Sequence, residues 1–335
     1  MTQPHPDSFS ATTNAAAADA ERRGAPPTLP WDGAAASTTP EQARRRPRIP
    51  QWATIFLVGL ALWAATVVVT FFTGNSNLIP TIILIGSFLV PVTFVSFAFS
   101  RADDVLHPQL IFTTFVVGGV LGVLGASVLE ATFLNSASGP SWVVVGLIEE
   151  GVKLAALWLL ALRLPRYTVR DGMVMGATVG LGFAALESAG YAFNALFTSQ
   201  NLSLSNLIET EVLRGILTPL GHGLWTAILG GALFATARAT GRLRLTPAVF
   251  GWYVVVVLLH AFWDASQTIA LWITLVLTGG PIVVMTPQGT APGLTQGQVH
   301  LYTGLSWTLM LLDGAIGVLI LLNHWRAAQR SSISA

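Results

Sequence analysis

The most informative stretch of this chain is SWVVVGLIEEGVKLAALWLLAL, residues 141–162. It is long enough to cross a membrane as one helix, because a hydrocarbon core of about 30 Å needs about 20 apolar residues. Near its middle stand Glu149, Glu150 and Lys153, although an ionisable side chain inside a membrane costs several kcal/mol. The stretch therefore predicts a membrane helix that carries part of a functional site.

The rest of the chain has the same apolar character. Its 335 residues are 53% hydrophobic and only 10% charged, against roughly 25% charged residues in a soluble domain. The mean hydropathy is +0.64. We expect an all-α, polytopic membrane helix bundle with about eight transmembrane helices, over residues 53–73, 78–99, 109–129, 141–162, 172–197, 213–237, 247–275 and 300–322.

The lipid bilayer is then the principal surrounding of the chain. A net charge of +1 gives no reason to expect a nucleic-acid partner. The absence of Cys excludes disulfides, thiolate nucleophiles and Cys-based metal sites.

The ends of the chain differ from its centre. Residues 1–50 are rich in Ala, Thr, Pro and Ser and contain no apolar segment, so we expect a disordered N-terminal tail. Residues 51–325 form the predicted membrane domain and residues 326–335 a short C-terminal tail. The first apolar run, from Ala53, is long enough to span the membrane, so it is interpreted as an anchor and not as a cleaved signal.

The distribution of Arg residues over the loops predicts how the chain is oriented in the membrane. With eight spans, 15 of the 16 Arg residues fall on one side, and Arg214 is the exception. The positive-inside rule places that side, and both termini, in the cytoplasm of a multi-pass protein of the cell membrane. Four charged residues near the outer surface are open to two interpretations, substrate steering or simple solvation: Glu130, Glu209, Glu211 and Arg214. The outer segment 278–299, rich in Gly, Pro, Thr and Gln, is expected to be a mobile loop.

The buried polar residues come from four spans and reach similar depth. At a rise of about 1.5 Å per residue they lie about 12–15 Å below the outer ends of their helices. Spacings of four residues put Glu149 with Lys153, and His260 with Asp264, on common helix faces. The full set is Glu149, Glu150, Lys153, Glu187, His222, His260 and Asp264.

Two imidazoles with several carboxylates can bind zinc or a harder divalent metal. We predict that His222, His260 and Glu187 bind the metal, and that Asp264 is either a fourth ligand or the group that orients His260. Either Glu149 or Glu150 would activate a water molecule as general base, while the other pairs with Lys153.

The residues Glu149-Glu150-x-x-Lys153, Phe183-x-x-x-Glu187, His222 and His260-x-x-x-Asp264 resemble the motifs of the PrsW family of intramembrane proteases. That family belongs to a wider clan that includes type II CAAX prenyl endopeptidases and bacteriocin-processing relatives. The prenyl branch has His where this chain has Glu187, so the resemblance favours the PrsW branch.

The resemblance implies that residues 51–325 are a protease domain that cuts a single-span membrane protein. An anti-sigma factor or a similar regulator is the implied substrate, and zinc the implied cofactor, with metal-free activation of water by Glu and His left open. A proton- or cation-coupled transporter and an inactive protease-like scaffold are the competing functions, because buried Glu, His and Asp also form proton relays. The oligomeric state is not predicted.

Overall fold

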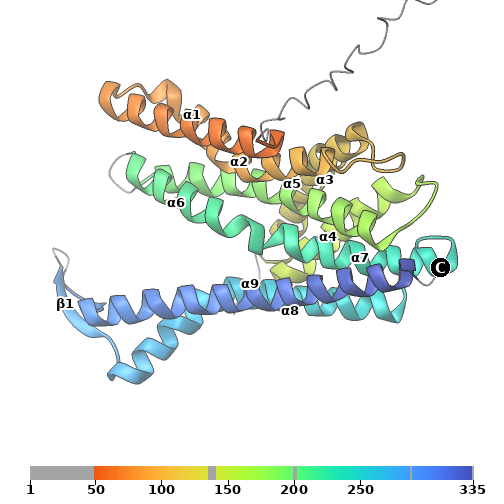
Figure 1. The fold of residues 1–335 in the computed structure, drawn as a ribbon. Coiled ribbons are helices and arrows are strands. Elements are labelled where there is room, and N and C mark those ends of the chain that lie inside the picture. The colour runs from red at the N-terminus through yellow and green to blue at the C-terminus, as the bar shows by residue number, and fades with distance from the viewer. Residues whose placement is uncertain (1–48, 135–140, 199–201, 287–288, 334–335) are drawn as a thin grey trace, which may run out of the picture. The chain divides into compact units, whose positions relative to one another are not determined.

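The computed structural model describes residues 49–134, 141–198, 202–286 and 289–333 (Figure 1). The predicted disordered tail therefore lies, for residues 1–48, outside the described part of the chain. The helices are α1 (Gln51–Thr73), α2 (Ile79–Phe99), α3 (Pro108–Phe133), α4 (Trp142–Ala161), α5 (Val169–Leu196), α6 (Leu204–Leu217), α7 (His222–Thr240), α8 (Pro247–Thr278) and α9 (Gln296–Ile333). Two short 3-10 turns, η1 (Ser76–Leu78) and η2 (Thr218–Leu220), precede α2 and α7.

The prediction of an all-α membrane bundle is confirmed. By length and composition, seven helices in the described residues could cross a membrane, and α6 with α7 count as one of them. Helix α4 is not among the seven, because its 20 residues include Glu149, Glu150 and Lys153. It is otherwise apolar and occupies the predicted fourth span almost residue for residue.

Helix α5 is the centre of the bundle. It packs against α2, α3, α6 and α7, while α8 and α9 pack together beyond α7 and α1 packs on α2 (Figure 1). In the long stretch from Asp171 to Ala185 on α5, every residue except the half-buried Val174 is buried. Seventeen of its 28 residues are buried, more than in any other described helix.

The contact between α5 and α7 is a backbone-to-backbone contact. A Cβ atom at Gly172, Gly176 or Gly180 would overlap the carbonyl oxygen of Gly230, Thr226 or His222 on α7. Small residues allow membrane helices to approach closely, since lipid supplies no hydrophobic drive for their association. This four-residue spacing of glycines places the start of α7 directly against α5.

Two regions differ from the prediction. The expected span 213–237 is interrupted at η2, because Pro219 has no amide hydrogen to continue the helix and its ring clashes with the preceding turn. As a result α7 begins at His222, with Gly221 as its cap. The segment 278–299 contains two strands that were not expected, β1 (Ile282–Thr286) and β2 (Gly289–Gly293), an antiparallel pair with Ile282 opposite Gly293. Its mobility stays a prediction.

Candidate active site

The site is built on one turn of α4. Spacings of three and four residues place Lys153 over both preceding carboxylates, so that Lys153 Nζ lies 3.1 Å from Glu149 Oε2 and 2.8 Å from Glu150 Oε1. The side chains of Lys153 and Glu150 are 0% exposed, whereas that of Glu149 is 8% exposed. The two carboxylates thus differ in access, although they are neighbours in sequence.

The imidazole of His222 reaches this turn from the first residue of α7. Its Nδ1 lies 2.7 Å from Lys153 Nζ and 3.9 and 3.8 Å from Glu149 and Glu150. The break at η2 makes this possible, because the ring projects from a helix end instead of from the middle of a continuous span. The close contact of Gly180 with the His222 backbone fixes that helix end.

The second imidazole, His260, comes from the middle of α8. Its Nδ1 lies 3.0 Å from Glu150 Oε1, and its Nε2 lies 3.7 Å from Glu149 Oε2. One donor atom from each of Glu149, Glu150, His222 and His260 lies within 4.8 Å of the others. Among the described residues this is the group whose donor atoms are close enough to hold a metal ion.

Glu187 and Asp264 lie at the edge of this group. Glu187 Oε2 is 3.0 Å from His222 Nε2, on the far side of the imidazole from α4. Asp264 Oδ2 is 3.5 Å from His260 Nε2. Both carboxylates therefore contact an imidazole, and each can orient the ring that it touches. Their predicted role as direct ligands stays a prediction.

Aromatic rings enclose the imidazoles. Trp225 stacks on His260 with ring centres 4.8 Å apart, and Phe183 meets His222 edge-on at 5.1 Å. Lys153 Nζ lies 3.9 Å from the centre of the Phe183 ring. Sequence analysis did not single out Trp225, although its position three residues after His222 puts both side chains on one face of α7.

Arg214 is a further polar group that sequence analysis placed outside the site. Its Nη2 lies 2.5 Å from Glu187 Oε2, and Glu211 on the same helix is 4% exposed. Glu211 accepts a hydrogen bond of 2.8 Å from Ser87 on α2. Solvation therefore does not account for either residue. A straight span measured from its outer end cannot reveal that α6 folds against α2 and α5.

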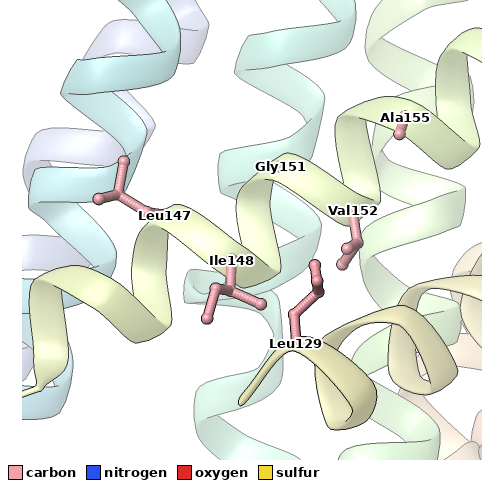
Figure 2. A pocket seen from close by; sticks show the side chains of 6 residues that line it. All are labelled: Leu129, Leu147, Ile148, Gly151, Val152 and Ala155. Carbon is pink, nitrogen blue, oxygen red and sulfur yellow. The ribbon is translucent and has the colours of Figure 1, made fainter. Parts of the chain in front are cut away.

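A second face of α4 forms an apolar groove with a volume of about 420 Å³, shown in Figure 2. Leu129 of α3 and residues of α4 line it, and none of the lining residues is polar. A groove of this composition suits a lipid chain or an apolar side chain, and it supplies no group for proton transfer. The chemistry of α4 thus belongs to its opposite, polar turn. The α4 residues that line the groove are Leu147, Ile148, Gly151, Val152 and Ala155.

Comparison with known sequences agrees with this geometry. The sequence model described as "PrsW family intramembrane metalloprotease" matches residues 107–287, which include every predicted site residue. This chain belongs to the PrsW family of intramembrane metalloproteases. PrsW family proteases are intramembrane peptidases, and the family assignment makes this chain one of them.

Two curated relatives carry the name Protease PrsW. The chain is 27% identical to the protein of Halalkalibacterium halodurans over 158 residues, covering 45% of this chain and 67% of that protein. It is 26% identical to the protein of Clostridioides difficile over 125 residues, covering 37% of this chain and 50% of that protein. The second match thus spans about half of the relative's length. No solved structure matches this PrsW family chain.

Proposed function

We propose that this PrsW family chain is an intramembrane endopeptidase that hydrolyses a peptide bond in a membrane-anchored protein. The observation that supports this function is the convergence of Glu149, Glu150, His222 and His260 from three helices into one group with donor atoms within 4.8 Å. A fold gains nothing from burying such groups in a membrane, where each costs free energy, so their convergence indicates chemistry.

Glu149 is the proposed general base. Glu150 has no exposed side-chain surface and is held by Lys153 at 2.8 Å and by His260 at 3.0 Å. Glu149 has looser contacts, 3.1 Å to Lys153 and 3.7 Å to His260, and part of its side chain is exposed. A base has to reach a water molecule and change its protonation, and the less confined carboxylate is better suited to both.

The donor set fits a divalent metal. Imidazole and carboxylate are ligands that zinc accepts, and five carboxylates face only two permanently charged cations in this region. With neutral imidazoles the carboxylates outnumber the cations, and a dication would offset part of that excess. Glu149 or Glu150 together with His222 and His260 would hold it. The carboxylates are Glu130, Glu149, Glu150, Glu187 and Asp264, and the cations are Lys153 and Arg214.

Lys153 contacts the same donor atoms that would bind the metal. Its ammonium contacts Glu149, Glu150 and His222, so a metal at these donors would compete with it for the same lone pairs. The contact of Lys153 with the Phe183 ring remains available when the carboxylates turn elsewhere. When bound, the metal would supply Lewis acidity, lowering the pKa of a water molecule and polarising the scissile carbonyl.

In the proposed reaction, Glu149 first accepts a proton from water and later donates it to the leaving group. Glu149 removes a proton from water as the water oxygen attacks the carbonyl carbon of the scissile bond, and the carbonyl oxygen takes the negative charge. Lys153 is the proposed source of positive charge that stabilises that oxygen. The protonated Glu149 then donates its proton to the leaving amide nitrogen as the carbon–nitrogen bond breaks, which yields a carboxylic acid and an amine. Transfer of the acid proton to the amine leaves a carboxylate and an ammonium group, and Glu149 is again ionised.

The proposed substrate is a single-span membrane protein, such as an anti-sigma factor or a similar regulator, and both termini of the protease are proposed to be cytoplasmic. Membership of the PrsW family supports a membrane-embedded substrate. The site lies on membrane-spanning helices, so a substrate in the same bilayer reaches it by lateral diffusion. Its helix must unwind locally first, because internal hydrogen bonds shield the backbone carbonyls.

Co-expression with a tagged single-span protein tests the proposal. We expect cleavage by the natural chain, and loss of cleavage in Glu149→Gln, which keeps the shape of the side chain and removes the base. Glu209→Gln is the matched control, because Glu209 is exposed on α6 and lies outside the site. Equal cleavage by Glu149→Gln and the control would contradict the role of Glu149. An absence of cleavage by the natural chain, across a panel of single-span proteins, would favour an inactive scaffold.

A further inference from the structure

The surroundings of Arg214 extend the site beyond the motif residues. Its Nη2 lies 2.5 Å from Glu187 Oε2, and its Nε donates a hydrogen bond of 2.8 Å to Ser188 Oγ. Its guanidinium carbon lies 4.3 Å from the centre of the Tyr191 ring. Three side chains of α5 thus hold one guanidinium by an ion pair, a hydrogen bond and a ring contact. The planar fork of Arg suits this combination, whereas a Lys ammonium would not make all three contacts.

Glu187, which Arg214 holds in place, in turn contacts the His222 imidazole. The same oxygen, Oε2, contacts both Arg214 Nη2 and His222 Nε2, the latter at 3.0 Å. An ionised carboxylate only accepts hydrogen bonds, so Nε2 of a neutral imidazole must carry the proton. The lone pair is then on Nδ1, which lies 2.7 Å from Lys153 Nζ and faces both carboxylates of α4.

The backbone that carries Arg214 is itself anchored. Glu211, one turn before it on α6, accepts the hydrogen bond from Ser87 Oγ in a notch of α2 at Gly86. A Cβ atom at Gly86 would overlap Glu211 Oε2, so glycine leaves room for the carboxylate in the orientation that it has here. Helix α6 is therefore fixed to α2 at Glu211 and to α5 at Arg214.

We infer that Arg214 is a positioning residue of the active site, which acts through Glu187 to set the tautomer and the orientation of the His222 imidazole. The inference rests on the proposed function for its catalytic consequence. Arg214 has no direct contact with Glu149, Glu150 or His260 among the contacts of the described residues, so its effect must pass through Glu187. It is also the one Arg in the sequence outside the predicted cytoplasmic regions, in keeping with a local role.

Substitution of Arg214 tests the inference through turnover. We expect Arg214→Gln to lower kcat by about 10- to 100-fold with KM nearly unchanged, the size of effect seen when a group behind a catalytic imidazole is lost. Arg214→Lys, which keeps the charge, should retain more activity, and added guanidinium should partly restore an Arg214→Gly variant. Glu209→Gln on the same helix is the control and should leave turnover unchanged.

A double-mutant cycle with Glu187→Gln then separates positioning from general stability. If Arg214 acts through Glu187, adding Arg214→Gln to a Glu187→Gln variant should lower kcat little further. If the fold-reduction in kcat of the double variant equals the product of the two single reductions, the inference is overturned, because Arg214 would then act by another route.

Nitrogen NMR of histidine-labelled protein gives a readout that needs no peptidase activity. His222→Gln identifies the His222 signals. We expect the natural chain to show Nε2 protonated and Nδ1 unprotonated, and Arg214→Gln to shift both signals toward a tautomer mixture. Unchanged His222 signals in a folded Arg214→Gln protein would overturn the inference. Since the spectrum is independent of cleavage, failure of the proposed function and failure of this inference are distinguishable.

Discussion

Gly180 is the position where a single methyl group should disturb the active site most directly. In Gly180→Ala the new Cβ would overlap the carbonyl oxygen of His222, and it would lie 2.7 Å from the carbonyl carbon and 2.8 Å from Thr226 Oγ1. An ordinary contact begins near 3.4 Å. Because the obstacle is helix backbone, it cannot rotate away, and α5 and α7 must separate by about 1 Å to relieve the overlap with the carbonyl oxygen.

The expected change in the free energy of unfolding of Gly180→Ala follows from two opposing effects. Ala is favoured over Gly in a helix by about 0.8–1.0 kcal/mol, whereas inserting a methyl group into a tightly packed contact costs about 1–3 kcal/mol. With backbone as the obstacle we take the upper end of that cost, so Gly180→Ala should lower the free energy of unfolding by about 2 kcal/mol. Since His222 moves with the start of α7, and a misplacement of about 1 Å costs about 100-fold in rate, turnover should fall by a similar factor.

Gly190 provides the matched control on the same helix. A Cβ atom there has no neighbour within 4 Å, so Gly190→Ala should raise stability by about 0.5–1 kcal/mol and leave turnover unchanged. Thermal unfolding in one detergent, together with cleavage of a single-span substrate, measures both quantities. Gly180→Ala that is as stable and as active as Gly190→Ala would refute this account of how α5 holds His222.

Three further outcomes are expected. His222→Ala and His260→Ala should each reduce the divalent metal in purified protein more than Asp264→Asn does, and equal metal content in all three by elemental analysis would contradict the ligand assignment. Mass spectrometry should map the cut near the outer end of the substrate helix, at Gly or Pro residues that unwind cheaply, whereas a cut on the cytoplasmic side would contradict the proposed topology. Hydrogen bonds from the amides of Leu106 and Val105 hold the pKa of Asp103 below its ordinary value. Asp103 therefore stabilises the fold above the unfolded-state pKa of about 3.9, and this contribution is lost as pH falls through the lower folded-state pKa. Asp103→Asn should lower the melting temperature at pH 7 but not at pH 2, and a deficit that persists at pH 2 would contradict this reasoning.

Apolar length was sufficient to predict most helices. The prediction for residues 53–73 differs from α1 by two residues at one end, and that for residues 78–99 differs from α2 by one. A membrane helix must satisfy its backbone internally over a fixed thickness, so hydropathy constrains both the type and the length of the element. The same reasoning predicted that the polar residues of four helices lie at one depth in the membrane, and in the structure these residues contact one another.

The break before His222 could not be read from apolar length. Residues 204–240 qualify as one candidate membrane span by length and composition, and Pro219 within it is compatible with either a kink or a true interruption. The choice depends on tertiary contacts, since the Ser87–Glu211 and Glu187–Arg214 pairs hold α6 in place. Partners this far apart in sequence leave no trace in residue spacing, which is why Arg214 was interpreted as a surface group.

The distribution of charge in the site narrows down where a water molecule would react. Glu150 is paired with Lys153, and Glu187 is paired with Arg214, so the side of the site around His222 is already neutralised. Glu149 shares Lys153 with Glu150, and the carboxylates of Glu149 and Asp264 lie 3.7 and 3.5 Å from the same atom, His260 Nε2. Two carboxylates therefore face the His260 side of the site, where both could balance a bound dication. Glu149, the more exposed carboxylate of the α4 pair, borders that side, so the charge balance and the access of water favour the same residue as the base.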